Sequence, residues 1–98
     1  MIVLLLTAVK PGLRGELSRW FIEPRAGVFV GNAPARVRDR LWLKVKKDLS
    51  DGSAVMICSA RTEQGFSVFT HGDHDRMPVD FEGLVLIRRK LEKRTDAP

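Results

Sequence analysis

The sequence contains a single cysteine, Cys58, and no apolar stretch long enough to span a lipid bilayer. One cysteine excludes a disulfide within the chain, which fits a reducing compartment, and we therefore expect a cytoplasmic protein. The apolar run near the start covers residues 2–9, whereas a membrane helix needs roughly 20 apolar residues. No basic residue precedes this run and Lys10-Pro11 ends it, so it predicts a buried strand over residues 2–7 rather than a signal peptide.

Internal repeats, linkers and low-complexity segments are also missing from the 98 residues, which predict one domain over residues 1–98. So short a chain exposes much of its surface, which favours further burial in a dimer. The net charge of +5 and the isoelectric point near 10.0 favour a polyanionic partner, but they indicate nothing about the fold.

Apolar periodicity and turn residues predict two helices and five strands. The helices are expected over residues 13–22, ended by Pro24, and from Pro34 to about residue 49, with Asn32 as the N-cap. The strands are expected over residues 2–7, 27–30, 54–60, 66–70 and 84–87, with a hairpin loop at 62–65 and a polar loop over 71–77. This order predicts an α+β fold in which both helices cover one face of a mostly antiparallel sheet. Cys58 and both tryptophans are expected in the core.

The second helix combines an apolar side with a dense set of basic residues. At about 100° per residue, one side of the helix is apolar and the side next to it is basic. The apolar positions are Val37, Leu41, Val45 and Leu49, and the basic positions are Arg36, Arg40, Lys44 and Lys47, with Arg38 near the other edge of the apolar side. Such a stripe is either a solvated rim, whose aliphatic stems cover the core, or a surface for phosphates.

A set of short motifs, in a fixed order, resembles one known family. They are Thr7 after the first strand, Leu13-Arg14-Gly15, Trp20, Glu23, the stretch RAGVFVG at 25–31, Trp42, TEQGF at 62–66 and PVDFEGL at 78–84. In this order and spacing they resemble CRISPR-associated protein two of the type I-E, or E. coli-type, systems. The resemblance covers nearly the whole chain. It implies a ferredoxin-like sandwich with two helices on a sheet of four to five strands, although the periodicity identifies only one strand between the helices, where that fold has two.

The resemblance also implies a function in CRISPR spacer acquisition, an antiviral defence. Members of the family form homodimers that lie between two dimers of the CRISPR integrase, CRISPR-associated protein one. Together these proteins capture foreign duplex DNA and insert it into the CRISPR array. In that assembly the small protein serves as a spacer and as a platform for the DNA backbone, while the integrase performs the strand transfer. No membrane partner and no cofactor is expected.

The same resemblance assigns candidate contacts one residue at a time. Basic residues in the family's DNA-contacting positions are Arg14, Arg36, Arg38 and Arg76, with Lys10 placed by position alone. At Arg76 the family pattern can show two adjacent arginines, where this chain has Asp75-Arg76. Glu63 and Glu82 fall where the family places acids that face basic patches of the integrase. Without the resemblance, the two acids are ordinary exposed carboxylates that contribute little.

Two other functions stand beside this one. A metal-dependent endonuclease for RNA or DNA has been ascribed to the family, with Mg²⁺ held by an acid just past the first strand. Here that place reads Thr7-Ala8-Val9, which argues against nuclease activity and leaves no catalytic residue to name. The cluster His71, Asp73, His74 and Asp75 lies in a polar loop, and we expect no metal site there. An RNA-binding module of the RRM type is the other alternative, but Phe66 and Phe69 point to opposite faces of a strand.

Overall fold

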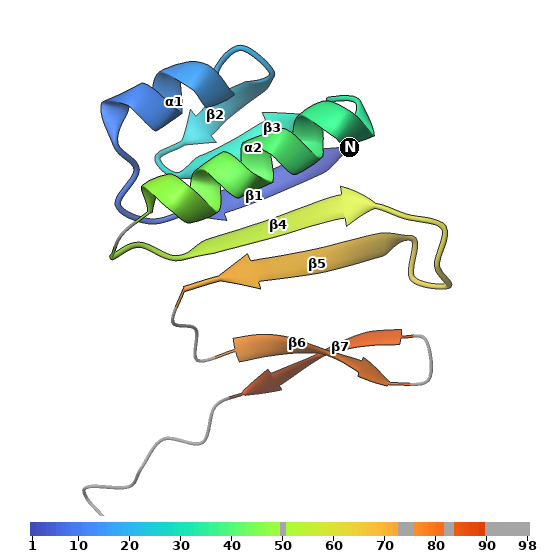
Figure 1. The fold of residues 1–98 in the computed structure, drawn as a ribbon. Helices are drawn as coiled ribbons and strands as arrows, with labels where there is room; N and C mark the ends of the chain where they lie inside the picture. The colour runs from blue at the N-terminus through green and yellow to red at the C-terminus, as the bar shows by residue number, and fades with distance from the viewer. Residues whose placement is uncertain (50, 73–75, 82–83, 90–98) are drawn as a thin grey trace, which may run out of the picture.

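The computed structural model describes residues 1–49, 51–72, 76–81 and 84–89, and Figure 1 shows their arrangement. The elements follow one another as β1 (Ile2–Leu6), α1 (Pro11–Leu17), β2 (Phe21–Arg25), β3 (Val28–Gly31), α2 (Ala35–Asp48), β4 (Ala54–Ser59), β5 (Phe66–His71), β6 (Arg76–Phe81) and β7 (Leu84–Arg89). The first six elements form a βαββαβ unit, and β5 extends its sheet. This is the expected α+β, ferredoxin-like fold.

The main sheet has five strands in the order β2-β3-β1-β4-β5, and every neighbouring pair is antiparallel. The apolar sequence IVLLL of β1 occupies the centre of the sheet, where both strand edges are paired. Leu4 is paired with Phe29 of β3 on one side and with Met56 of β4 on the other. All three side chains are buried, so the register of the sheet is fixed by one apolar row.

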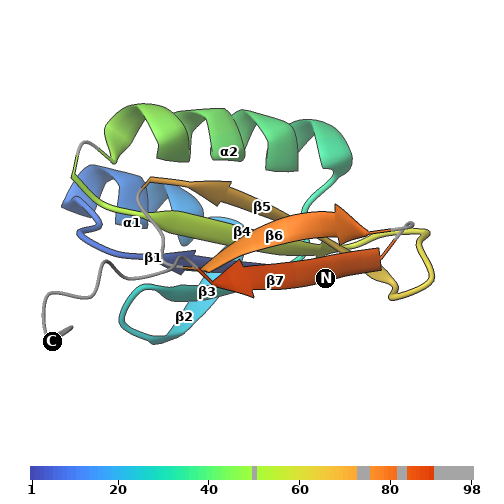
Figure 2. The ribbon, with the colours of Figure 1, turned by 90° about the horizontal axis from the view of Figure 1, so that it is seen from below.

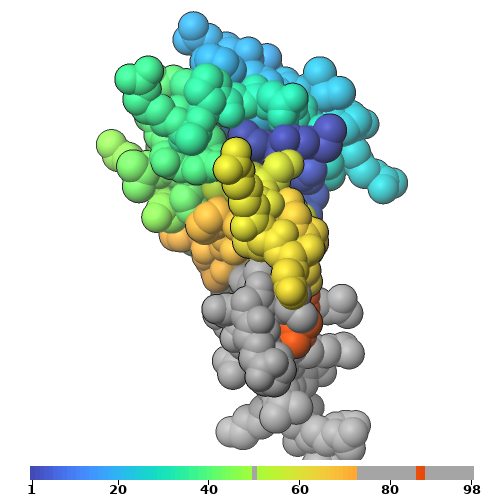
Figure 3. All heavy atoms as spheres, turned by 90° about the vertical axis from the view of Figure 1, so that its right-hand side faces the viewer, coloured from blue at the N-terminus to red at the C-terminus, as the bar shows by residue number. Residues whose placement is uncertain are grey.

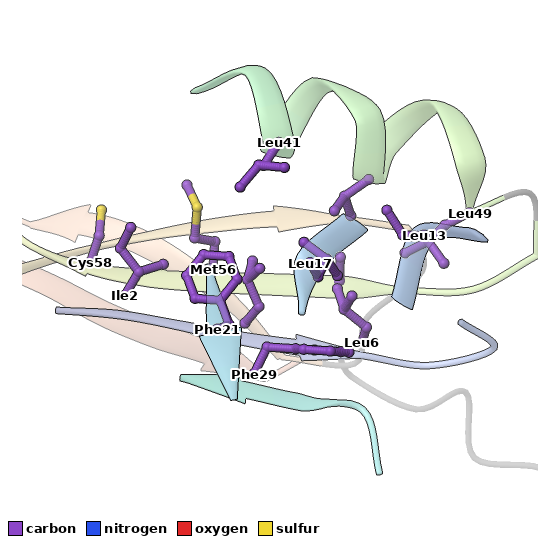
Figure 4. Packing of buried hydrophobic residues seen from close by; sticks show 13 residues of the cluster. Ile2, Leu6, Leu13, Leu17, Phe21, Phe29, Leu41, Leu49, Met56 and Cys58 are labelled. Carbon is purple, nitrogen blue, oxygen red and sulfur yellow. The ribbon is translucent and has the colours of Figure 1, made fainter. Parts of the chain in front are cut away.

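Both helices lie on the same face of the sheet (Figure 2), and the core fills the space between them. Phe29, Leu17 and Val45 are completely buried, and they come from the sheet, α1 and α2 respectively. Figure 4 shows the buried side chains of the sheet and of both helices meeting in one cluster. Cys58 is buried in this cluster, as expected. Trp42 is partly buried against it, but Trp20 is 37% exposed, so its assignment to the core is wrong.

The segment between the helices differs from the sequence prediction. The helix expected over residues 13–22 ends at Leu17, and β2 begins at Phe21, so two strands separate α1 from α2. Pro24 does not end a helix; it lies within β2, at the outer edge of the sheet, where its missing N–H costs least. The pairing of β2 with β3 shifts register between Ile22 and Arg25, around this proline. The apolar residues Leu13, Leu17 and Phe21 have the spacing of one helix face, although Phe21 belongs to β2, because β2 and α1 contribute to the same core.

Two further expectations about local structure are wrong. The N-cap of α2 is Pro34, which makes no side-chain capping bond, rather than Asn32. The expected polar loop over 71–77 is partly strand, because His71 ends β5 and β6 begins at Arg76. Among the described strands, β6 and β7 pair with each other alone, as a separate two-stranded sheet beyond the β5 edge (Figure 1). Leu86 and Ile87, neighbours that point to opposite faces of this hairpin, are 47% and 57% exposed.

Candidate nucleic-acid interface

The outer side of α2 carries a line of exposed cations, which we call the α2 stripe: Arg36, Arg40 and Lys47. Positions four and eleven residues after Arg36 return to the same side of an α-helix. Leu43 lies on this side too, and its 63% exposure shows that the side faces solvent. None of the three cations forms an ion pair within the part of the chain that the structure describes. The stripe therefore presents its full charge outward.

Arg38 stands apart from the α2 stripe. It lies two residues after Arg36, and therefore nearly opposite to it around the helix. Its guanidinium Nη2 lies 3.0 Å from Oδ1 of the neighbouring Asp39, and its side chain is 27% exposed. Arg36 and Arg38, which the sequence groups together at the start of the helix, thus face different sides of α2.

Lys44 also stands apart from the α2 stripe, because it forms an ion pair with Glu16 of α1. Its Nζ lies 2.9 Å from Oε2 of Glu16, so it joins α2 to α1 instead of standing in a solvated face. The hydrogen bond to Glu16 and the charge of that carboxylate raise the pKa of Lys44. The Glu16–Lys44 pair is partly exposed on both sides, and exposed ion pairs of this kind contribute little to stability.

Arg14 belongs to a second cluster, at the other end of the helical layer. Its Nε donates to both oxygens of Glu23, at 3.0 and 3.2 Å, and Glu23 Oε2 also accepts the backbone N–H of Gly27 at 2.9 Å. The Gly27 N–H is the largest cause that lowers the pKa of Glu23; burial opposes it, and Arg14 adds to it. Because the pKa is lowered on folding, the resulting stabilisation is present above pH 4.5 and is lost as the pH falls below it. From the sequence Glu23 is only a motif residue, since no local pattern links it to Arg14.

The fold separates the candidate basic residues into two groups. β3 ends beside the start of β1 and α2 follows directly, so Arg36 lies at the end of the molecule where β1 begins. The β4–β5 loop lies at the same end (Figures 1 and 3). Arg14 and Glu23 lie at the opposite end, because Gly27 accepts a hydrogen bond from the Leu6 N–H at the end of β1. The cations therefore span the molecule rather than converge on one point.

The segment after β1, where the family places an acid, contains backbone strain instead. Ala8 has a φ of 58°, a left-handed conformation that alanine rarely adopts. The flanking Thr7 is held by Ser53, whose N–H donates to Thr7 Oγ1 at 2.8 Å. Lys10, exposed, is the N-cap residue of α1. Within the described residues, no three His, Cys, Asp or Glu side chains gather as metal ligands.

Of the remaining candidate residues, some are described by the structure and others lie outside the described residues. Glu63 is exposed in the tight β4–β5 loop, which is closed by a hydrogen bond from the Gly65 N–H to the Thr62 carbonyl at 3.0 Å. Arg76 is the first residue of β6, rather than a loop residue. Glu82 and most of the His71-to-Asp75 cluster lie outside the described residues. No helix in the described part of the chain is both long enough and apolar enough to cross a membrane.

The sheet face opposite the helices is apolar, and we call it the open face. Its residues alternate with the buried ones along each strand and are joined across the sheet by the strand register. They are Val3, Leu5, Ile22, Val28, Val30, Val55, Ile57 and Val68. Leu5, in the central strand, is 38% exposed and Ile22 is 69% exposed. No described element covers this face (Figure 2). A contiguous apolar surface of this kind marks an interaction site.

Comparison with known families adds one finding to this geometry. Residues 1–86 match the family described as CRISPR-associated protein (Cas_Cas2CT1978). The match runs from β1 into β7, and so it includes both basic groups and the open face. The match covers most of the chain and agrees with the fold, and the protein belongs to the Cas2 family of CRISPR-associated proteins.

Proposed function

We propose that this protein acts in CRISPR spacer acquisition, as a homodimeric platform for duplex DNA that also spaces two dimers of the CRISPR integrase. The type I-E assignment is part of the proposal. The observation that carries it is the α2 stripe, whose cations are exposed and unpaired within the described residues. Cations of this kind bind phosphates without reading sequence, which suits a protein that must accept any foreign DNA.

Dimerisation is supported by the open face. A single copy leaves this apolar surface in water, and a second copy is a partner of the right chemistry because both faces are apolar and of the same size. The β6–β7 hairpin adds a second argument, since an isolated two-stranded sheet is marginally stable on its own. Pairing β7 with the sheet of the partner copy would cover the unpaired edge of β7 and the edge of the partner's sheet. The dimer would then present two copies of each basic group to one duplex.

The proposed partner contacts rest on exposed acids. Glu63 is held at the surface by the tight β4–β5 loop, where it is available to a basic patch of the integrase. Glu82 is proposed on the resemblance alone. We do not propose an endonuclease, because Ala8 stands where the family's metal-binding acid belongs. Glu23, which is tied through Gly27 to the end of β1, is already bound to Arg14 and Gly27.

The test is DNA binding by the complex of this protein with its integrase, measured by fluorescence anisotropy on a labelled random-sequence duplex at several salt concentrations. Replacing Arg36 and Arg38 together by Ala is expected to weaken binding equally for all sequences. The log–log salt slope should fall by about two if both residues contact phosphates, and by about one if only Arg36 does, at roughly 0.9 per contact. Folding should persist because Leu41 and Val45 are untouched.

A matched control replaces Arg19 and Lys46, two exposed cations outside the α2 stripe that have no ion pair among the described residues. This control removes the same charge, so it should change affinity much less if position matters. A double variant at 36 and 38 that stays assembled and keeps the affinity and slope of the parent would contradict the platform. So would a control that is the more damaging of the two.

A further inference from the structure

The carboxylate of Glu23 is fixed in space before any ligand arrives. Glu23 lies in the stretch of β2 where the register shifts, and such irregularities re-aim side chains. Its Oε2 accepts the Gly27 N–H at 2.9 Å, and the Gly27 carbonyl accepts the Leu6 N–H at 2.7 Å. The acid is thus tied through the β2–β3 turn to the central strand. Its side chain is 19% exposed, so the anchor is mostly shielded from solvent.

Arg14 donates to Glu23 through the Nε atom of its guanidinium. Its Nε donates to both oxygens of Glu23, and neither Nη group forms a hydrogen bond within the described residues. A guanidinium carries five N–H donors, four of them on the two Nη atoms. The side chain is 42% exposed, so an anion from outside can approach the guanidinium. Two Nη groups side by side match two oxygens of one phosphate.

We infer that Glu23 is a positioning residue that holds the Arg14 guanidinium ready for a phosphate of the duplex. This inference rests on the proposed function, because it concerns how one of the proposed DNA contacts works. A free arginine must lose the rotational freedom of its long side chain when it binds. Ordering it beforehand removes a cost that otherwise lowers affinity by about twofold to tenfold.

A simple count of charges makes the opposite prediction. Glu23 is an anion beside a surface that is to bind DNA, so its removal should strengthen binding by relieving repulsion. Positioning instead predicts that loss of the acid weakens binding, even though the protein becomes more positive. The two effects differ in sign, and the sign of one substitution therefore decides between them.

The experiment measures the affinity of the assembled complex for the labelled duplex, with Glu23→Ala, Arg14→Ala and the double variant. Glu23→Ala should weaken binding by about twofold to tenfold. Its salt slope should stay that of the parent because Arg14 remains cationic, whereas Arg14→Ala should lower the slope by about 0.9. In the Arg14→Ala background, Glu23→Ala should cause no further loss. Glu23→Gln keeps one acceptor oxygen and should restore part of the affinity.

Glu16→Ala is the matched control, because it removes an acid from the same helical layer and frees Lys44 rather than Arg14. It should bind DNA as tightly as the parent, or more tightly. The inference is overturned if Glu23→Ala binds as tightly as the parent or more tightly, or if its loss persists in the Arg14→Ala background. Unchanged affinity of Arg14→Ala overturns it as well and leaves the α2 stripe standing. A parent complex that does not bind the duplex overturns the proposed function and this inference with it.

Discussion

Single residues at the end of β1 show how this chain differs from the pattern it resembles. The family's acid is absent, and Ala8 takes a left-handed conformation that costs an L-residue about 1–2 kcal/mol. Aspartate and asparagine tolerate that conformation better than alanine does. The backbone at position 8 is thus compatible with an acid, although the sequence supplies none.

The strain at Ala8 leads to a prediction about stability. Ala8→Gly should leave the free energy of unfolding unchanged or raise it by up to about 1 kcal/mol, because relief of strain is partly offset by the greater freedom of glycine in the unfolded chain. Ala8→Val should lower it by about 1–2 kcal/mol, since a β-branched residue fits this conformation poorly. Urea denaturation of the three proteins checks the order. A valine variant as stable as the glycine variant would refute the strain.

At the scale of elements, two of the turns with left-handed glycines, β2–β3 and β4–β5, test what tertiary contacts add. Gly27 and Gly65 have nearly equal φ values, 81° and 84°. A Cβ on Gly27 would collide with the Leu6 carbonyl, whereas a Cβ on Gly65 would meet nothing within 4 Å. The first turn is therefore pinned against the central strand, and the second is free at the surface.

Alanine at each glycine should separate the two contributions. Gly65→Ala should lower the free energy of unfolding by about 1–2 kcal/mol, the cost of the backbone conformation alone. Gly27→Ala should lower it by about 3 kcal/mol or more, because the collision is added and the N–H that holds Glu23 is displaced. Thermal denaturation of the pair measures the difference. Equal losses would mean that the β2–β3 turn moves away from Leu6 without cost.

At the scale of the whole molecule, the open face and the β6–β7 hairpin lead us to expect a dimer. A mass near twice 11.0 kDa is expected for the parent in light scattering at micromolar concentration. Leu5→Glu places a charge at the centre of the open face and should shift the mass toward 11.0 kDa, because burying an unpaired carboxylate is costly. Leu43→Glu makes the same change on the outer side of α2 and should keep the dimer. A parent that scatters as a monomer would refute the dimer.

The apolar pattern of the sequence determines much of this structure. The IVLLL run predicted a buried strand, which is β1, and the spacing of Val37, Leu41 and Val45 predicted α2 and the side it buries. Ordered motifs predicted a CRISPR-associated family, which the match over residues 1–86 confirms. These features are local or periodic, so a linear pattern suffices to reveal them. The exposed cations of the α2 stripe follow from the same period.

Only the tertiary structure decided the rest. Trp20-Phe21 fits a helix by spacing, yet Phe21 begins β2, because pairing with β3 satisfies its backbone and still buries its ring. The pairs Arg14–Glu23 and Glu16–Lys44 each join residues of two different elements, and they exist only once α1 has packed beside β2 and α2. Which cations are neutralised and which remain open to phosphates is therefore set by packing, since a charge finds its partner only after the elements that carry both have met.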